Sequence, residues 1–147
     1  MDDITAFGYS LQLDNGDLII ENGQLLTVAG KPNLIQALTL RVLTPYGSDQ
    51  FNTTYGLDVS QAFTQPNGLR MVKELLKLNL VRTLGADPRV DDIREVLFDD
   101  DPAYWANHPE IDPQVLIAQH HRRIWQGEVI ISTAQGQPVP LPVSVDI

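Results

Sequence analysis

Three short apolar runs stand near the start of the chain, at residues 11–13, 18–20 and 25–28. An Asn-Gly pair separates each run from the next, Asn15-Gly16 first and then Asn22-Gly23. Asn-Gly favours tight hairpin turns because both residues tolerate a positive φ angle. The pattern therefore predicts a small β-meander over residues 7–28.

Apolar residues recur every three or four positions in two later segments, which is the spacing of an amphipathic helix. The first helix is predicted from Pro32 to Val42, because proline suits a first helical turn and Thr44-Pro45-Tyr46-Gly47 ends the pattern. The second and longest helix is predicted over residues 69–84, with Asn67 as its cap and Gly85 at its end.

The segment between these helices is predicted to be an irregular loop that ends in a short helical turn at residues 57–63. Its aromatic residues are expected to anchor the loop in the core, and they are Tyr46, Phe51 and Tyr55. A second loop, residues 99–113, begins with three aspartates and is expected to be a solvated acidic insertion.

Three strands are predicted in the second half of the chain, at residues 90–98, 128–133 and 139–145. The last strand has alternating prolines, which lack a backbone donor, so it is predicted to lie at a sheet edge. The segment from Asp112 towards Trp125 is predicted as a helix, although Val115 and Ile117 also suit a strand.

Together these elements predict an α+β fold, a single small domain in which a mixed or antiparallel sheet packs with two main helices. Residues 1–30 are the N-terminal β-meander extension, and residues 31–147 are the main domain. With 147 residues, of which 43% are hydrophobic, the chain can build one core. It shows neither a secretory signal nor an apolar run of the ~20 residues needed to span a bilayer, so cytoplasmic synthesis is expected.

The chemistry of the chain points away from catalysis. There is no cysteine, phosphate-binding loop or nucleophile elbow, and adjacent His120 and His121 point apart and do not suit a shared metal ion. Residues 99–101 lack the spacing of a calcium-binding loop. No glutamate has an aspartate nine residues downstream, the Glu–Asp spacing sought for a phage-type lysozyme. No catalytic residue, cofactor or metal is predicted, and the net charge of −9 argues against a nucleic-acid partner.

Several motifs follow one another in the middle of the chain. The first predicted helix ends in the Thr-x-x-Gly turn at 44–47, and the aromatic-Gly step Tyr55-Gly56 follows. After the long helix comes Asp87-Pro88-Arg89, directly before a strand. In this order and spacing, residues 32–98 resemble the small baseplate wedge proteins of contractile phage tails and contractile injection systems. In that family the last motif reads Glu-Pro-Arg, so Asp87 keeps the charge on a shorter side chain.

The resemblance implies a structural protein and not an enzyme. Proteins of that family lie in the baseplate, bind the larger wedge subunits and template the first ring of sheath, whose strands add to the edge of their sheet. The implied partners are therefore the sheath subunit and the larger wedge subunits, while contact with the central hub or spike stays open. No direct membrane contact is implied, and the implied location is the baseplate of a tail-like particle.

Seven residues are candidates for partner contacts, namely Asp87, Pro88, Arg89, Arg41, Glu128, Ile130 and Ser132. Arg89 would offer two parallel N–H donors to a wedge subunit. The same motif is also explained without a partner, because Pro88 stops a helix and the chain then continues into a strand. Arg41 lies at a helix end, where a cation also complements the helix dipole. Since prolines block the last strand, the open sheet edge is expected at residues 128–133.

Six of the ten basic residues lie between positions 70 and 94. They suit either a solvated helix face or a basic patch for an acidic partner.

Two other functions stay open beside the baseplate function. One is a phage-type lysozyme-like peptidoglycan hydrolase, which the missing Glu–Asp spacing disfavours, and the other is a soluble domain that binds an unrelated protein.

Overall fold

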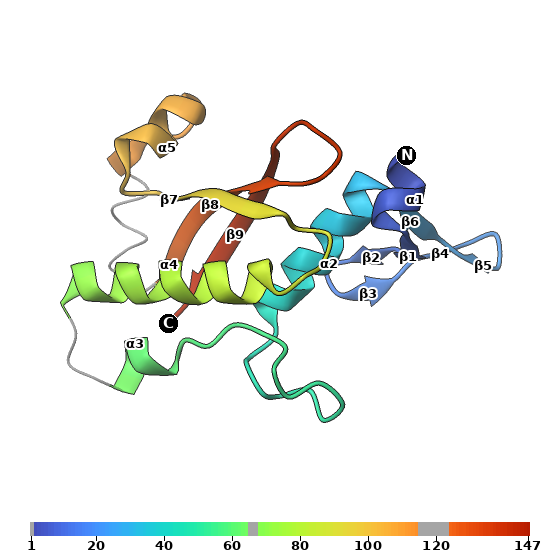
Figure 1. Ribbon diagram of the computed structural model, residues 1–147, viewed down its shortest axis with the longest axis horizontal. Helices are drawn as coiled ribbons and strands as arrows, with labels where there is room; N and C mark the ends of the chain where they lie inside the picture. The colour runs from blue at the N-terminus through green and yellow to red at the C-terminus, as the bar shows by residue number, and fades with distance from the viewer. Residues whose placement is uncertain (1, 65–67, 115–123) are drawn as a thin grey trace.

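The computed structural model describes residues 2–64, 68–114 and 124–147. A three-stranded antiparallel sheet, in the order β7-β8-β9, carries two long helices on one face (Figure 1). These elements are β7 (Asp92–Phe98), β8 (Ile124–Ser132), β9 (Val139–Asp146), α2 (Lys31–Leu43) and α4 (Leu69–Gly85). The predicted α+β fold is confirmed.

Both long helices bury one apolar stripe against the sheet. In α2 the buried leucines and valine are four residues apart, at Leu34, Leu38 and Val42, and α4 continues the same spacing from Val72 to Leu84. The predicted helix bounds are confirmed to within one residue at each end. The position before α4 is Gly68, which makes no side-chain cap, and Asn67 lies outside the described residues.

Alternation along β8 and β9 decides which face of the sheet is buried. Every second side chain of these strands points towards the helices, and Trp125 contacts Phe98 edge to face at 5.3 Å between ring centroids. A Cβ atom at Gly127 would lie 2.4 Å from the carbonyl oxygen of Leu97 and 3.0 Å from Phe98 Cδ1. Glycine is therefore required where β8 passes β7.

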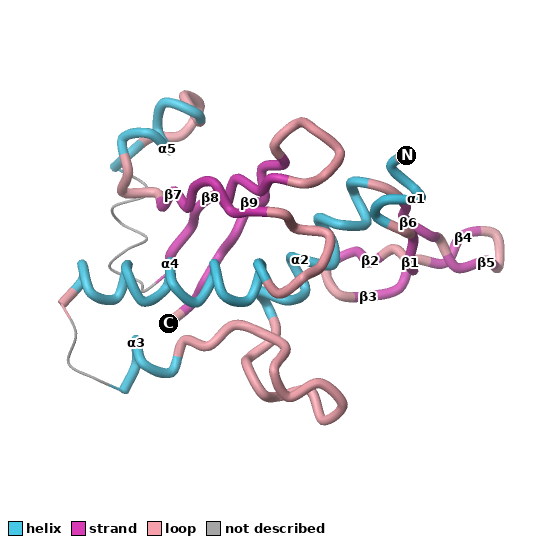
Figure 2. The backbone as a smooth tube through the Cα atoms, in the orientation of Figure 1, coloured by secondary structure: helices cyan, strands magenta, loops and turns pink. Residues whose placement is uncertain are grey.

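The N-terminal extension has a short helix, α1 (Asp3–Phe7), which the sequence analysis missed, followed by six short strands. The strands are β1 (Tyr9–Leu11), β2 (Leu13–Asp14), β3 (Asp17–Leu18), β4 (Ile20–Glu21), β5 (Gln24–Leu25) and β6 (Thr27–Ala29). Both Asn-Gly turns are confirmed, with positive φ at all four residues. The predicted runs pair in order through these turns, β2 with β3 and β4 with β5, but as two separate hairpins and not as one sheet (Figure 2). The additional pairing of β1 with β6 was not predicted.

Two further short helices are α3 (Ser60–Thr64) and α5 (Pro102–Asn107). The former confirms the predicted helical turn, whereas α5 lies in the segment predicted to be a solvated loop. Tyr104 of α5 is buried with Leu97, on the sheet face opposite to α2 and α4. Most of the segment predicted as helix or strand after Asp112 lies outside the described residues, and its proposed end at Trp125 is wrong because β8 already includes that residue.

Replacing Gly127 by alanine should destabilise the fold by about 1–3 kcal/mol, because the added methyl group would be forced against β7. Urea unfolding at neutral pH measures the change. The matched control is Gly85→Ala, since Gly85 is in the last turn of α4 with nothing within 4 Å of a built Cβ. It should leave the free energy of unfolding unchanged or raise it by up to about 1 kcal/mol. Equal losses in both variants would contradict the close approach of β7 and β8.

Candidate partner-binding surfaces

Asp87 and Arg89 form a compact ion pair directly after α4. Asp87 Oδ1 accepts hydrogen bonds from the backbone N and from Nε of Arg89, each at 2.9 Å, and Oδ2 accepts from Nη2 at 2.7 Å. The guanidinium also donates through Nη1 to the carbonyl oxygen of Phe7 at 3.2 Å. The motif therefore ties the exit of α4 to the end of α1, which is more than 80 residues away in sequence.

This geometry changes how the motif can meet a partner. The parallel donors Nε and Nη2, which the sequence analysis assigned to a wedge subunit, bind Asp87 of the same chain. Asp87 is 5% exposed, whereas Pro88 is exposed and Arg89 is only partly covered. A partner at this turn would meet Pro88 and the outer edge of the Arg89 guanidinium.

The loop between α2 and α3 is anchored through one aromatic residue and one glycine. The guanidinium carbon of Arg41 lies 4.5 Å from the ring centroid of Tyr55, so this candidate residue serves an internal cation–π contact. Gly56 has φ +109°, and its carbonyl oxygen accepts a hydrogen bond from Thr83 Oγ1 of α4 at 2.7 Å. The expectation that Phe51 anchors the core is wrong, because its side chain is fully exposed.

The expected open edge at residues 128–133 is wrong. β8 is the central strand and pairs on both sides, with β7 over one ladder and β9 over the other. The three candidate residues for partner contact on this strand can therefore act only through their side chains, which lie on the face opposite to α2 and α4. They are Glu128, Ile130 and Ser132.

Glu128 is already bound to His108, whose Nε2 lies 2.8 Å from Glu128 Oε2. This contact holds the end of α5 on that face. The hydrogen bond to Glu128 also raises the pKa of His108.

The two outer strands differ as edges. Pro140 and Pro142 lie opposite Ile130 and Glu128 in an unbroken ladder, so the positions without an N–H face away from β8. The prediction that this strand is an edge is confirmed. By the same alternation, Ser144 and Asp146 direct both their N–H and C=O groups outward, and no hydrogen bond occupies them within the described residues. A groove of about 340 Å³ runs beside this end of β9, lined partly by Val42, Leu57 and Val59.

The free edge of β7 has fewer backbone groups available for strand pairing than the length of the strand suggests. The ladder with β8 shifts register between Ile93 and Glu95, which is a β-bulge. At the other end, the N–H of Phe98 donates to Asp101 Oδ2 and its carbonyl oxygen accepts from the backbone N of Asp101, both at 2.9 Å. Bulges and local turns of this kind discourage strand addition.

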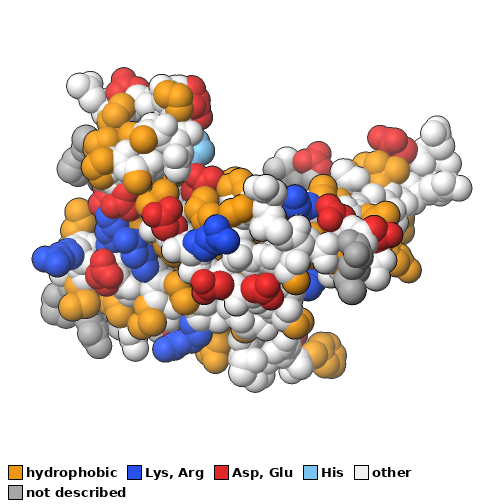
Figure 3. Space-filling model, turned by 45° about the horizontal axis from the view of Figure 1, so that its top comes forward, with side chains coloured by type: hydrophobic (Ala, Val, Ile, Leu, Met, Phe, Trp, Pro, Cys, Tyr) orange, Lys and Arg blue, Asp and Glu red, His pale blue; other side chains and the backbone are white. Residues whose placement is uncertain are grey.

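The acidic segment after β7 is not solvated as expected. Asp99 is fully buried, and Lys73 of α4 binds Asp100 and Asp101 at 2.8 and 2.7 Å. Of the six basic residues between positions 70 and 94, Lys73 and Arg89 therefore form ion pairs. The other four form none with the described residues. On the face in Figure 3, lysine and arginine side chains are interspersed with acidic ones and do not gather into one patch.

The part of the chain that the structure describes contains no cluster of three or more residues that could hold a metal ion. None of its helices is long and apolar enough to cross a membrane. Comparisons with protein-family models and with curated proteins found no match.

The Asp87–Arg89 pair should make the stability of the protein fall at acid pH. Burial alone would raise the pKa of Asp87, but the hydrogen bonds and charge of Arg89 outweigh burial and hold this pKa below its usual value. A carboxyl whose pKa is lowered by folding stabilises the folded state above its unfolded pKa of about 4, and this contribution is lost as the pH falls through the folded value. Asp87→Asn should therefore cost roughly 2 kcal/mol at pH 7 and much less near pH 3, measured by urea unfolding across that range.

Asp14→Asn is the matched control, because Asp14 is exposed and its carboxylate makes no hydrogen bond or ion pair within the described residues. Its free energy of unfolding should follow that of the unmodified protein at every pH. If Asp87→Asn instead lowered stability equally at pH 7 and pH 3, the loss would come from packing and not from the charge of Asp87.

Proposed function

We propose that this chain is a structural adaptor of a contractile baseplate, which joins the larger wedge subunits to the first ring of sheath. The sequence resemblance over residues 32–98 supports the class of particle. The observation that carries the mechanism is the proline-free end of β9, where Ser144 and Asp146 direct backbone donors and acceptors outward. In this role the protein is made in the cytoplasm and acts inside the assembled particle.

Strand addition is the mechanism that this edge favours. A sheath strand lying beside Ser144–Asp146 would pair with outward N–H and C=O groups, so affinity would come from backbone hydrogen bonds with little demand on sequence. Alternate side chains of the added strand would face the groove beside Val42, Leu57 and Val59. Prolines farther along β9 remove donors and would set where the added strand stops.

The Asp87–Arg89 turn would then meet the wedge subunits through Pro88 and the outer edge of the guanidinium. Because Asp87 and the Phe7 carbonyl already hold Arg89, its side chain is fixed before any partner arrives. A fixed side chain loses less conformational entropy on binding, which favours association.

Ser144→Pro should weaken binding of the sheath subunit roughly tenfold, because it removes an outward donor, and about 1.4 kcal/mol corresponds to that factor. The measurement is co-expression of the chain with the sheath and large wedge subunits of a contractile particle, followed by co-purification. The substitution continues the existing alternation of prolines, so it should keep the ladder with β8 and the thermal unfolding midpoint.

Ser144→Thr keeps the backbone N–H and should bind sheath like the unmodified protein. Wedge binding should be unaffected in both variants. If the unmodified chain retains neither subunit, the baseplate proposal fails. If Ser144→Pro retains sheath fully, the proposal of strand addition at this edge fails while the adaptor role stands.

A further inference from the structure

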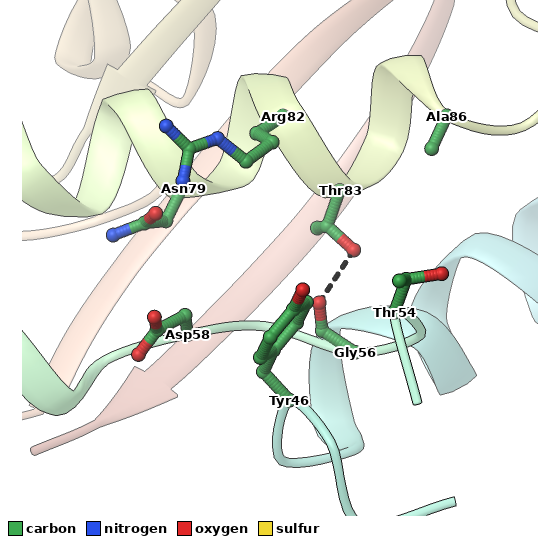
Figure 4. Close-up of a pocket in the computed structure, with 8 residues that line it drawn as sticks. All are labelled: Tyr46, Thr54, Gly56, Asp58, Asn79, Arg82, Thr83 and Ala86. Atoms are coloured by element: carbon green, nitrogen blue, oxygen red, sulfur yellow. Dashed lines mark hydrogen bonds between the residues drawn. The ribbon is translucent and has the colours of Figure 1, made fainter. Parts of the chain in front are cut away.

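A polar pocket of about 380 Å³ lies between α4 and the loop that precedes α3. Figure 4 shows Asn79 and Thr83 pointing from α4 towards the loop, and Tyr46 rising from the loop with its hydroxyl group towards α4. Asp58 lies on the loop side, below Asn79, and the Arg82 side chain extends along α4. The hydrogen bond from Thr83 to Gly56 fixes the spacing between the two walls. The pocket lining includes Ala86, next to Asp87, and Asp58, which lies between two residues that line the groove beside β9.

Asn79 is the unusual member of this pocket. Its side chain is 7% exposed, yet its carboxamide makes no hydrogen bond with any other described residue. The polar atoms of this amide are not sealed from solvent, because they open into the pocket. A ligand group that pairs with the amide would take the place of the water that reaches it there.

The neighbouring charges narrow the chemistry of such a group. Asp58 uses Oδ1 to accept two hydrogen bonds from Ser60, at 2.9 and 2.6 Å, and its Oδ2 makes none within the described chain. The hydrogen bonds from Ser60, with a smaller contribution from the charge of Arg82, lower the pKa of Asp58. One cation and one anion therefore flank Asn79, so a ligand of either charge would be attracted by one group and repelled by the other.

A neutral primary carboxamide satisfies this arrangement. It carries two N–H donors and one carbonyl acceptor, so it can exchange two hydrogen bonds with the Asn79 amide and give another to Asp58. The carbonyl oxygen can also accept from the Arg82 guanidinium. Asparagine and glutamine side chains present this group.

The loop that forms the pocket wall favours a polypeptide over a free small molecule. Phe51 belongs to that loop and is fully exposed, in a turn that the Asp49 side chain caps. Asp49 Oδ1 accepts from the backbone N of Phe51 at 2.8 Å and of Asn52 at 3.2 Å. Exposed aromatic residues on fixed turns act as anchors in protein interfaces.

We propose that this pocket is a recognition site for an asparagine or glutamine side chain of a protein partner, with the exposed Phe51 of the same loop as an apolar anchor. It is a contact surface beyond those of the adaptor mechanism. Its test needs only the isolated chain, so its outcome is independent of the baseplate proposal.

The experiment is an NMR titration of the ¹⁵N-labelled full chain with N-acetylglutamine methylamide, following the side-chain amide of Asn79. We expect saturable shifts at Asn79 and at the Arg82 Nε–H. N-acetylmethionine methylamide, which has similar length but no side-chain carboxamide, should bind about tenfold or more weakly. Free glutamine, with its charged ends, should also bind more weakly than the blocked form.

Asn79→Leu supplies the decisive variant. It should abolish saturable binding of N-acetylglutamine methylamide while leaving the free energy of unfolding unchanged or higher, because the lost amide makes no hydrogen bond with any other residue that the structure describes. Equal binding of the glutamine and methionine probes, no saturable binding at all, or preferential binding of free glutamine would each overturn the proposal. So would a loss of stability in Asn79→Leu that matches the loss of binding.

Discussion

The alternation of side chains along β8 determines most of what the molecule can present to a partner. One set of positions, with Trp125 and Ile131, is buried under α2 and α4, while the other set faces α5 and solvent. Because β8 also pairs on both sides, its backbone is fully occupied. Any strand addition is thereby restricted to β7 and β9, and the bulge in one and the prolines in the other leave only short open stretches.

Two ion pairs hold segments that the sheet does not reach. Arg89 links the exit of α4 to Phe7 of the N-terminal extension, and Lys73 links α4 to the turn after β7. Lys73 reaches an aspartate 28 positions away, and Arg89 pairs with Asp87 nearby while it donates to a backbone carbonyl oxygen 82 positions away. Both cations look like free surface charges when the sequence is read alone. On the face in Figure 3, lysine and arginine side chains accordingly lie among acidic ones.

The parts of the fold that could be predicted are those set by local chemistry. The apolar spacing of the two helices, the Asn-Gly turns and the proline-marked edge each depend on residues within a few positions of one another. The errors arose where distant segments decide the outcome. The pairing of β1 with β6 joins the two ends of the N-terminal extension, and β7 occupies the side of β8 that was predicted to be free. The burial of Asp99 depends on packing around α5 and α4, which no local pattern reveals.

The candidate site shows the same division. The sequence indicated the Asp87–Arg89 turn, but not that the arginine would bind its own aspartate and a carbonyl oxygen of α1. Asn79 gave no signal at all, because an asparagine inside an amphipathic helix is read as a position of weak helix propensity. Its position becomes informative only when the loop from Tyr46 to Asp58 is seen closing over it. The Asn79 amide opens into the pocket and makes no hydrogen bond with another described residue, so a partner that supplies matching hydrogen bonds there would gain specificity.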